Sequence, residues 1–272
     1  MVPLILTIDL EWYYNGNQQG RVADFAQKSL AERYQYDRHQ IEKSTLAILK
    51  ILKKYRQKIT FFVVAELDQV YPKIIPQILY QGHEIALHSY RHDEARTANA
   101  LEKDLTASQP FQKKYGCIGF RSPRIKMSKK QLKVIKKFGY QYDSSVYGTT
   151  IFDFAGLKIL PVSVLPFTKK QLQKIPSNLD FALLKKCIPF GSGMLTGLLQ
   201  KNSRWLIGQY WRGYHQPACL FLHSWQINKP YYPAKFLLKS PFMIPYSFEC
   251  RDLLEFFCRY YRLLRARDYL DK

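Results

Sequence analysis

Residues suited to metal-assisted chemistry occur in three separate parts of the chain. The stretch His88-Ser-Tyr-Arg-His92 places two imidazoles four residues apart, Asp9 and Glu11 flank Leu10 near the start, and His223 follows an apolar run near the end. Histidines at this spacing fall on one face of a helical turn, close enough to share one cation. A carboxylate from elsewhere would complete the three protein ligands of an open catalytic zinc site.

The two carboxylates near the start are predicted to act together. Asp9 and Glu11 are two residues apart at a strand end, so both side chains point to one face. One could bind the cation while the other takes a proton from a water whose pKa the cation lowers. His223 is suited to protonate a departing amine from the opposite side. This set indicates metal-dependent hydrolysis of a C–N amide bond.

The elements that must position these residues alternate between short β-rich runs and helical patterns, which is the rhythm of βα units with parallel strands. Strands are expected at residues 3–10, 59–64, 84–87, 119–120, 157–165 and 219–222, and helices at 40–55, 70–80, 97–115 and 129–138. Asp9, His88, Arg121 and His223 then follow strand ends, where α/β barrels place their chemistry. A single site is therefore predicted.

The whole chain, residues 1–272, is interpreted as one catalytic domain, because 272 residues fit one α/β barrel and no linker or repeat divides them. Prolines and glycines interrupt the segment around 166–217, which is expected to be an insertion that forms a lid or substrate wall. An amphipathic helix is expected around 248–265, closing the domain. Its arginines leave membrane binding as an alternative to core packing.

The net charge of the chain indicates that its binding partners are negatively charged. Forty-two Lys and Arg against 21 Asp and Glu give +21, which attracts phosphate on a substrate, an anionic membrane or nucleic acid. The lysines form short, distributed clusters that fit solvated helix faces. No nucleic-acid-binding signature is present, so specific nucleic-acid recognition is not expected.

The cellular location is expected to be cytoplasmic. Five cysteines are odd in number and lack CxxC spacing, which fits reduced thiols. The apolar residues before Asp9 are too few for a signal peptide or a membrane span.

Five stretches resemble, in order, the five motifs of the polysaccharide deacetylases with NodB homology, carbohydrate esterase family 4. They are Thr7-Ile-Asp-Leu-Glu11, His88-Ser-Tyr-Arg-His92, Arg121-Ser-Pro-Arg124, Tyr142-Asp-Ser-Ser145 and Leu222-His-Ser-Trp225. Together with flanking residues, the resemblance covers about 4–226. It implies a distorted (β/α) barrel of about seven parallel strands.

The resemblance also implies a role for each motif residue. Asp9 would be the general base, oriented by Arg121. Glu11, His88 and His92 would be the metal ligands. His223 would be the general acid, held by the Asp143 carboxylate, and the backbone N–H of Arg124 would donate to the oxyanion. An arginine beside Asp9 keeps it ionised, and a carboxylate on His223 favours the protonated imidazole that an acid needs.

Two departures from the commonest family pattern stand out. Leu10 occupies the place of a second aspartate, so this D-x-E form resembles a branch that includes exopolysaccharide-associated deacetylases. Gln226 stands where that branch often has Glu, a change expected to affect the surroundings of the ligands rather than the ligands themselves.

Structural readings compete with the functional ones at three residues. His83 is expected to be a core residue, and His83-Glu84 is not a metalloprotease HExxH because Leu87 stands where the second histidine is needed. Trp225 is suited equally to the core or to a wall of the substrate pocket. Asp143 alone would be a turn residue beside two serines.

The leading hypothesis is removal of an N-acyl group, acetyl or formyl, from an amino sugar in a polysaccharide or lipid-linked precursor. One divalent cation is implied, Zn²⁺ first, with Co²⁺ or another divalent ion also suited to imidazole and carboxylate ligands. The charge favours a phosphate- or polyprenyl-linked sugar, met at the inner membrane face by peripheral contact with anionic lipid. Hydrolysis of a small non-sugar amide and a non-catalytic carbohydrate-phosphate binding protein are the alternatives.

Overall fold

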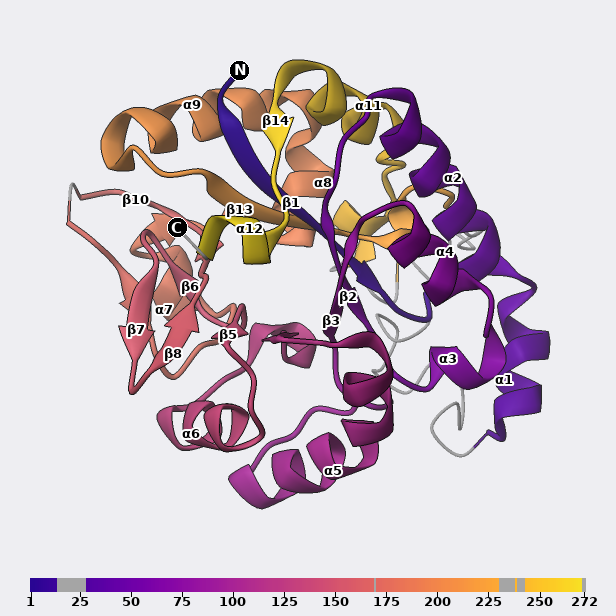
Figure 1. Cartoon of the computed structure of the whole chain (residues 1–272). Helices are drawn as coiled ribbons and strands as arrows, with labels where there is room; N and C mark the ends of the chain where they lie inside the picture. The colour runs from indigo at the N-terminus through magenta and orange to yellow at the C-terminus, as the bar shows by residue number, and fades with distance from the viewer. Residues whose placement is uncertain (14–27, 169, 230–237, 239–242, 271–272) are drawn as a thin grey trace.

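The computed structural model describes residues 1–13, 28–168, 170–229, 238 and 243–270 (Figure 1). Six parallel pairings join seven strands in the order β13 (Ala218–His223), β1 (Pro3–Leu10), β2 (Thr60–Val63), β3 (Glu84–Leu87), β4 (Gly119–Phe120), β5 (Tyr142–Asp143) and β8 (Leu157–Ile159). Strand β7 (Phe152–Phe154) adds antiparallel to β8, and β14 (Arg262–Leu263) pairs with β1. The expected α/β architecture with about seven parallel strands is confirmed.

Three further strands, β6 (Tyr147–Gly148), β9 (Val162–Ser163) and β11 (Gln173–Lys174), form a separate small sheet beside β13. Gly191 connects this small sheet to β13. Its N–H donates to the Ser163 carbonyl and its own carbonyl accepts from the Phe221 N–H, both at 3.0 Å. A Cβ at position 191 would lie 2.5 Å from the Cys219 carbonyl oxygen, so only glycine fits. The barrel is distorted because backbone outside the strands closes this part of its wall.

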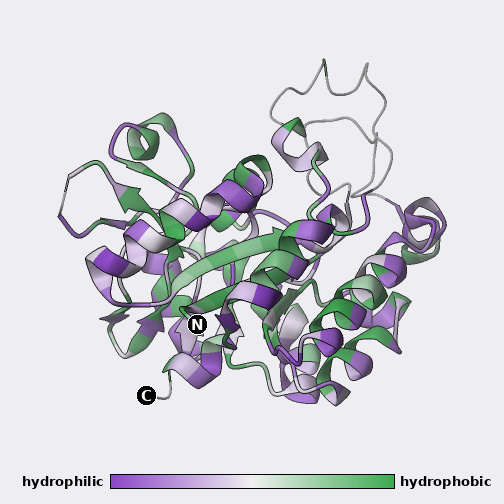
Figure 2. Cartoon of the chain, turned by 90° about the horizontal axis from the view of Figure 1, so that it is seen from above, coloured by the Kyte–Doolittle hydropathy of each residue, from purple (hydrophilic) through white to green (hydrophobic). Residues whose placement is uncertain are grey.

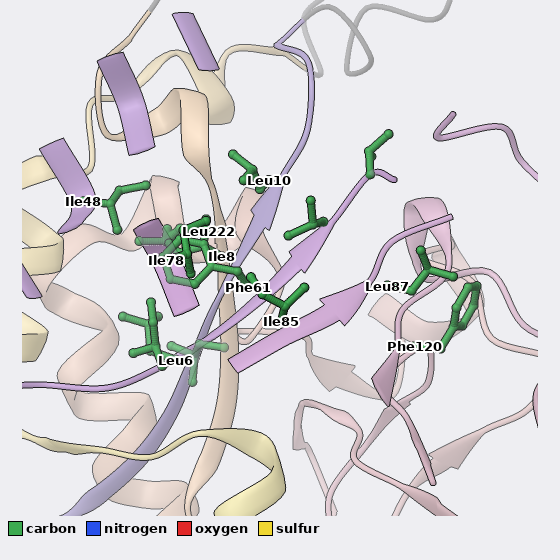
Figure 3. Packing of buried hydrophobic residues seen from close by; sticks show 14 of the residues in the cluster. Leu6, Ile8, Leu10, Ile48, Phe61, Ile78, Ile85, Leu87, Phe120 and Leu222 are labelled. Atoms are coloured by element: carbon green, nitrogen blue, oxygen red, sulfur yellow. The ribbon is translucent and has the colours of Figure 1, made fainter. Parts of the chain in front are cut away.

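Side chains along β1 alternate between two faces of the strand, one toward the outer apolar core and one toward the candidate site. Leu6, Ile8 and Leu10 belong to the outer apolar cluster that also contains Ile48 and Ile78, and Figure 3 labels all five. The odd-numbered positions point the opposite way, where Ile5 packs in a second cluster inside the barrel. Asp9 therefore faces the barrel interior near the C-terminal ends of the strands.

Six of the described helices lie outside the sheet, and they include those predicted at 40–55, 97–115 and 129–138. They are α1 (Leu30–Asp37), α2 (Gln40–Lys54), α3 (Leu67–Val70), α4 (Ile74–Tyr80), α5 (Ala98–Tyr115) and α6 (Lys129–Lys137). The single helix expected at 70–80 is instead the pair α3 and α4. At α6, Ser128 and Gln131 form a reciprocal capping box that fixes where the helix begins.

The helix expected around 248–265 is shorter than predicted. Helix α11 (Arg251–Tyr260) buries Leu253, Leu254 and Phe257. Tyr261 then adopts extended backbone, and the chain enters β14, whose pairing with β1 replaces the continued helix. A last helix, α12 (Ala266–Leu270), follows.

The segment 166–217, apart from residue 169, contributes both strands and helices. Strands β10 (Leu165–Pro166) and β12 (Cys187–Ile188) form a small antiparallel pair, with α7 (Phe181–Leu184) between them in the chain. Helices α8 (Gly193–Leu199) and α9 (Ser203–Tyr214) follow and pack against β13. Short 3₁₀ turns η3 (Pro123–Ile125), η4 (Gln200–Asn202), η5 (Ser224–Gln226) and η7 (Pro245–Ser247) complete the described elements.

Among the described helices, none has the length and apolar content needed to cross a bilayer. Figure 2 shows hydrophobic residues along the central strands and mixed surfaces on the surrounding helices.

Candidate active site

A cavity of about 280 Å³ opens at the C-terminal ends of the strands. Seven of the nine residues predicted for the site line it: Asp9, Glu11, His88, His92, Arg124, His223 and Trp225. The other two, Arg121 and Asp143, are fully buried and do not line it. Side chains from strands β1, β3 and β13 thus meet at one place, as the strand-end argument predicts.

Glu11, His88 and His92 form a compact, buried set of potential metal ligands. One donor atom from each lies within 4.8 Å of the others. Glu11 Oε2 is 2.5 Å from His92 Nε2 and 3.6 Å from His88 Nε2. Burial alone would raise the pKa of Glu11, but the neighbouring histidines, His92 first, hold that pKa well below its ordinary value. The Glu11 carboxylate is thus ionised and ready to bind a cation.

The donor set fits a divalent cation on its own geometry. Glu11 Oε2 is buried and has no hydrogen-bond donor aligned with it, although the two imidazoles are close. Buried acceptors are normally satisfied, so this arrangement suits three atoms that share a central ion better than three atoms bonded to one another. Carboxylate and imidazole ligands are those of three-ligand catalytic zinc sites.

A contact with a backbone carbonyl fixes the orientation of the His88 imidazole. Its Nδ1 lies 2.8 Å from the Arg121 carbonyl oxygen, which can only accept a hydrogen bond. Nδ1 therefore carries the proton, and the lone pair of Nε2 faces Glu11 and the cavity.

The helical turn expected for residues 88–92 is wrong. Ser89 and His92 have φ of 66° and 64°, in the left-handed region, and no helix forms there. The Ser89 hydroxyl accepts the His92 N–H at 2.8 Å, and the Ser89 carbonyl accepts the Ala65 N–H at 3.0 Å. A tight loop after β3, tied to the loop after β2, brings the two rings to a centroid separation of 5.0 Å.

Asp9 is held by a buried arginine. Arg121 donates from Nη1 to Asp9 Oδ1 and to the Thr7 hydroxyl, both at 2.7 Å. The rest of its guanidinium bonds to Ser144 and lies 4.0 Å from the ring centroid of Phe62. These contacts fix Asp9 Oδ1 and leave Oδ2 on the cavity side, 3.9 Å from His88 Nε2.

The expected contact between Asp143 and His223 is absent, and that prediction is wrong. The Asp143 carboxylate accepts two hydrogen bonds from Ser145, from its N–H at 2.8 Å and its hydroxyl at 2.7 Å. Burial raises the pKa of Asp143 to about 7, and the Ser145 bonds offset only part of that effect. The carboxylate organises the loop after β5, as its turn-like sequence indicates.

Gln226 takes the place beside His223. Its Oε1 lies 3.0 Å from His223 Nδ1 and also accepts the His223 backbone N–H at 2.9 Å, while its amide nitrogen donates to the Gly193 carbonyl at 3.3 Å. The fixed amide makes His223 Nδ1 the donor and turns Nε2 toward Glu11, 3.7 Å from Oε1. A residue three positions along the chain, within the turn η5, reaches His223 more directly than one on β5.

Aromatic rings pack against His223. Trp225 stacks on it with centroids 4.6 Å apart and an interplanar angle of 16°, and the indole N–H donates to Glu11 Oε1 at 3.3 Å. Tyr246 meets the same imidazole edge-on at 5.3 Å. Trp225 thus serves both as core and as cavity wall. Tyr246 was missed because nothing in the sequence around it marks a site.

Arg124 lies at the cavity rim with unusual backbone. Arg124 and Ile125 have φ of 59° and 52°, a conformation that non-glycine residues adopt at a cost. The Arg124 side chain lies 3.5 Å from Glu94, which Lys126 also contacts at 2.7 Å. Arg124 and Lys126 thus share the Glu94 carboxylate at the rim.

A buried network behind the ligands was not predicted. Glu66, fully buried in the loop after β2, accepts from Trp12 Nε1 at 2.7 Å and from Arg33 Nη1 at 2.6 Å, and Arg91 lies 3.4 Å away. Trp12 directly follows Glu11, and Arg91 directly precedes His92. This carboxylate therefore ties together the loops that carry two of the three potential ligands.

His83 lies at the other end of β3 and is not among the residues lining the cavity. Its Nδ1 accepts the Ile59 N–H at 3.3 Å, and burial, with Lys58 and Arg265 nearby, lowers its pKa to about 4. It is a neutral core histidine, as the sequence suggests.

The sequence profile of the family described as Polysaccharide deacetylase matches residues 31–142. Over 101 residues the chain is 31% identical to a peptidoglycan-N-acetylglucosamine deacetylase of Bacillus cereus, covering 36% of this chain and 47% of that one. Over 103 residues it is 32% identical to a peptidoglycan-N-acetylmuramic acid deacetylase of Bacillus subtilis, covering 36% and 39%. The matched region spans less than half the length of these relatives.

The fold resembles that of solved structures over nearly its whole length. A protein described as a polysaccharide deacetylase of Mycobacterium smegmatis aligns with a TM-score of 0.60 at 18% identity, covering 96% of this chain and 86% of that one. The Puue allantoinase aligns with a TM-score of 0.56 at 15% identity, covering 99% and 89%. The profile match over residues 31–142, the related sequences and the shared fold agree with the five ordered motifs, and they make the chain similar to the polysaccharide deacetylases in sequence over that region and in fold over most of its length.

Proposed function

We propose that this protein is a metal-dependent hydrolase that removes an N-acyl group, acetyl or formyl, from an amino sugar. One observation carries the proposal: a cation-binding set, a carboxylate held by a buried arginine and an oriented histidine all face one cavity. A binding protein has no need of these three features together.

Glu11, His88 and His92 would hold one divalent cation, Zn²⁺ by the chemistry of its ligands. When bound, it would supply Lewis acidity and lower the pKa of a water. Asp9, fixed by Arg121, takes the proton of the attacking water through Oδ2. His223 Nε2 then donates a proton to the departing amine, with Gln226 holding the ring. The Arg124 backbone N–H is proposed as the oxyanion donor, and Trp225 as the wall against the sugar.

The substrate we propose is an N-acylated sugar in a polysaccharide or lipid-linked precursor. Relatives that act on peptidoglycan sugars support the acetylated-sugar part. The net charge of +21 supports a substrate that carries phosphate. Five buried free cysteines are in keeping with a cytoplasmic location.

The test is acid release from a panel of N-acetylated and N-formylated sugars, free, polymeric and lipid-linked, together with small cyclic and linear amides. The wild type should release acetate or formate from a sugar, and a chelator should stop it. Asp9→Asn keeps all three ligands but lacks the base, so it should bind metal and turn over poorly. Turnover of only the small amides would contradict the sugar assignment, and acid release that survives chelation would contradict the metal.

A further inference from the structure

Charge is distributed unevenly along the chain. Residues 166–217 contain eight Lys and Arg but a single acidic residue, Asp180, whereas the whole chain has 42 against 21. Asp180 is already engaged, because it caps α7 through the Leu183 N–H at 2.8 Å and lies 3.4 Å from Lys174. The surface built by this segment therefore has no other carboxylate of its own.

Large apolar side chains are exposed on the same segment. Phe181 is 81% exposed, Phe167 63% and Trp205 62%. These residues lie on α7, after β10 and on α9, three elements that Figure 1 places on one side of the molecule, opposite α1 and α2. The Phe167 N–H donates to the Lys186 carbonyl at 3.0 Å, and α9 contacts β10, so the elements adjoin.

Helix α9 presents two different sides. Leu206, Ile207 and Tyr210 are buried against the domain, whereas Arg204 and Trp205 are exposed. A groove of about 900 Å³ runs along this helix. It is lined by Ile188, Leu199, Lys201, Asn202, Arg204, Trp205, Leu206, Gly208, Trp211 and Arg212, which include two tryptophans, three cations and no carboxylate.

We propose that this surface docks on an anionic lipid bilayer. The docking face is defined by Phe167, Phe181, Lys185, Lys186, Lys201, Arg204, Trp205 and Arg212. Tryptophan and phenylalanine favour the boundary between headgroups and acyl chains, and lysine and arginine stems lie along apolar surface while their charges reach the phosphates. Separated aromatic anchors within a cationic surface match an anionic interface more closely than a flat apolar protein partner does.

The segment that carries this docking face also contributes to the catalytic cavity. Asn178, Leu179 and Ser192 belong to the same segment and line that cavity. The inference about the bilayer stands apart from the proposed hydrolysis, because it depends on the outer face of the segment and not on the metal site.

The test is co-sedimentation of the whole protein with vesicles of phosphatidylcholine alone and of phosphatidylcholine with phosphatidylglycerol, at about 0.15 M salt. The protein should bind only the anionic vesicles, and tryptophan emission should shift to the blue, since Trp12 and Trp225 are already buried. Trp205→Ala should lose most of that shift. Lys185→Gln with Lys186→Gln should lower the partition coefficient roughly 30-fold, because each cation near such a surface adds about one kcal/mol.

Matched controls separate this face from general charge attraction. Lys50→Gln with Lys53→Gln removes the same charge from exposed positions on α2, and Tyr80→Ala removes an aromatic ring that is 94% exposed on α4. Both controls should bind as the wild type does. Equal weakening by the two lysine pairs, equal binding to neutral vesicles, or no binding to either vesicle would overturn the proposal.

Discussion

Both ends of the central sheet hold a buried glutamate, and the two carboxylates differ in how fully their oxygens are hydrogen-bonded. At the N-terminal end of β3, Glu84 is fully buried, yet its oxygens accept from Tyr142 at 2.9 Å, Thr60 at 2.7 Å and the Arg267 N–H at 3.1 Å. At the C-terminal end, Glu11 is equally buried and one oxygen lacks a donor. The same residue type is structural where its neighbours satisfy it and available for binding where they do not.

The largest effect should come from Asp9, the proposed proton acceptor at the C-terminal end. Asp9→Asn should lower kcat by about 10³-fold, since a general base contributes roughly 10²–10⁴. Metal content should stay near that of the wild type, because none of the three ligands changes. Steady-state kinetics and metal analysis on the same sample check this. Glu84→Gln is the matched change at the other end and should cost stability while leaving kcat within a few-fold.

A second contrast concerns the partner of His223. Gln226→Leu removes the acceptor that holds the imidazole and should lower kcat about 10- to 100-fold, as expected for a residue that orients a catalytic group. Asp143→Asn should lower kcat much less, because Asp143 bonds to Ser145 and not to His223. A larger loss in Asp143→Asn than in Gln226→Leu would restore the role expected from the sequence.

Glu66 should act on metal affinity through the loops that it joins. Glu66→Gln weakens three contacts behind Glu11 and His92 and should reduce metal affinity about tenfold. Competition with a chromogenic chelator measures this without an activity assay. Glu84→Gln lowers stability through comparable buried bonds, so equal loss of metal affinity in both variants would show a general effect of unfolding.

The last predicted effect is a pH dependence of stability at the N-terminal end, away from the cavity. The folded pKa of His83 is lowered to about 4, while the unfolded value is 6.5, so the unfolded chain binds the proton first. Stability from this group is full above pH 6.5 and is lost as pH falls toward 4, by about 3 kcal/mol. Denaturant unfolding across that range should show a shallower decline in His83→Gln. An unchanged decline would exclude His83 as its source.

The sequence predicted strands β1 to β4 and β13 and the convergence of the site, because both depend on local patterns. Alternation in β1 and the apolar run of β2 are readable without tertiary contacts, and parallel strands bring Asp9, His88 and His223 to one edge. The loop at 88–92 was not readable, because its left-handed residues depend on hydrogen bonds to another strand end.

The hydrogen-bond partner of His223 could not be predicted from the sequence either. Asp143 and Gln226 are both chemically able to accept from His223, and only the turn η5 decides between them. The Glu66 network joins residues from four separate parts of the chain, so no pattern of residue spacing in the sequence predicts it. Elements followed from periodicity, whereas side-chain pairing required the fold.

The most direct test of the central claim is metal content per chain in wild type, His88→Ala and His83→Ala, measured by mass spectrometry on purified protein. The two variants remove a histidine from opposite ends of the same strand, so they compare the two ends under one substitution. We predict about one divalent ion per chain in wild type and in His83→Ala, and a large loss in His88→Ala. Equal metal content in all three proteins, or none in any, would contradict a metal site at the C-terminal end of the barrel.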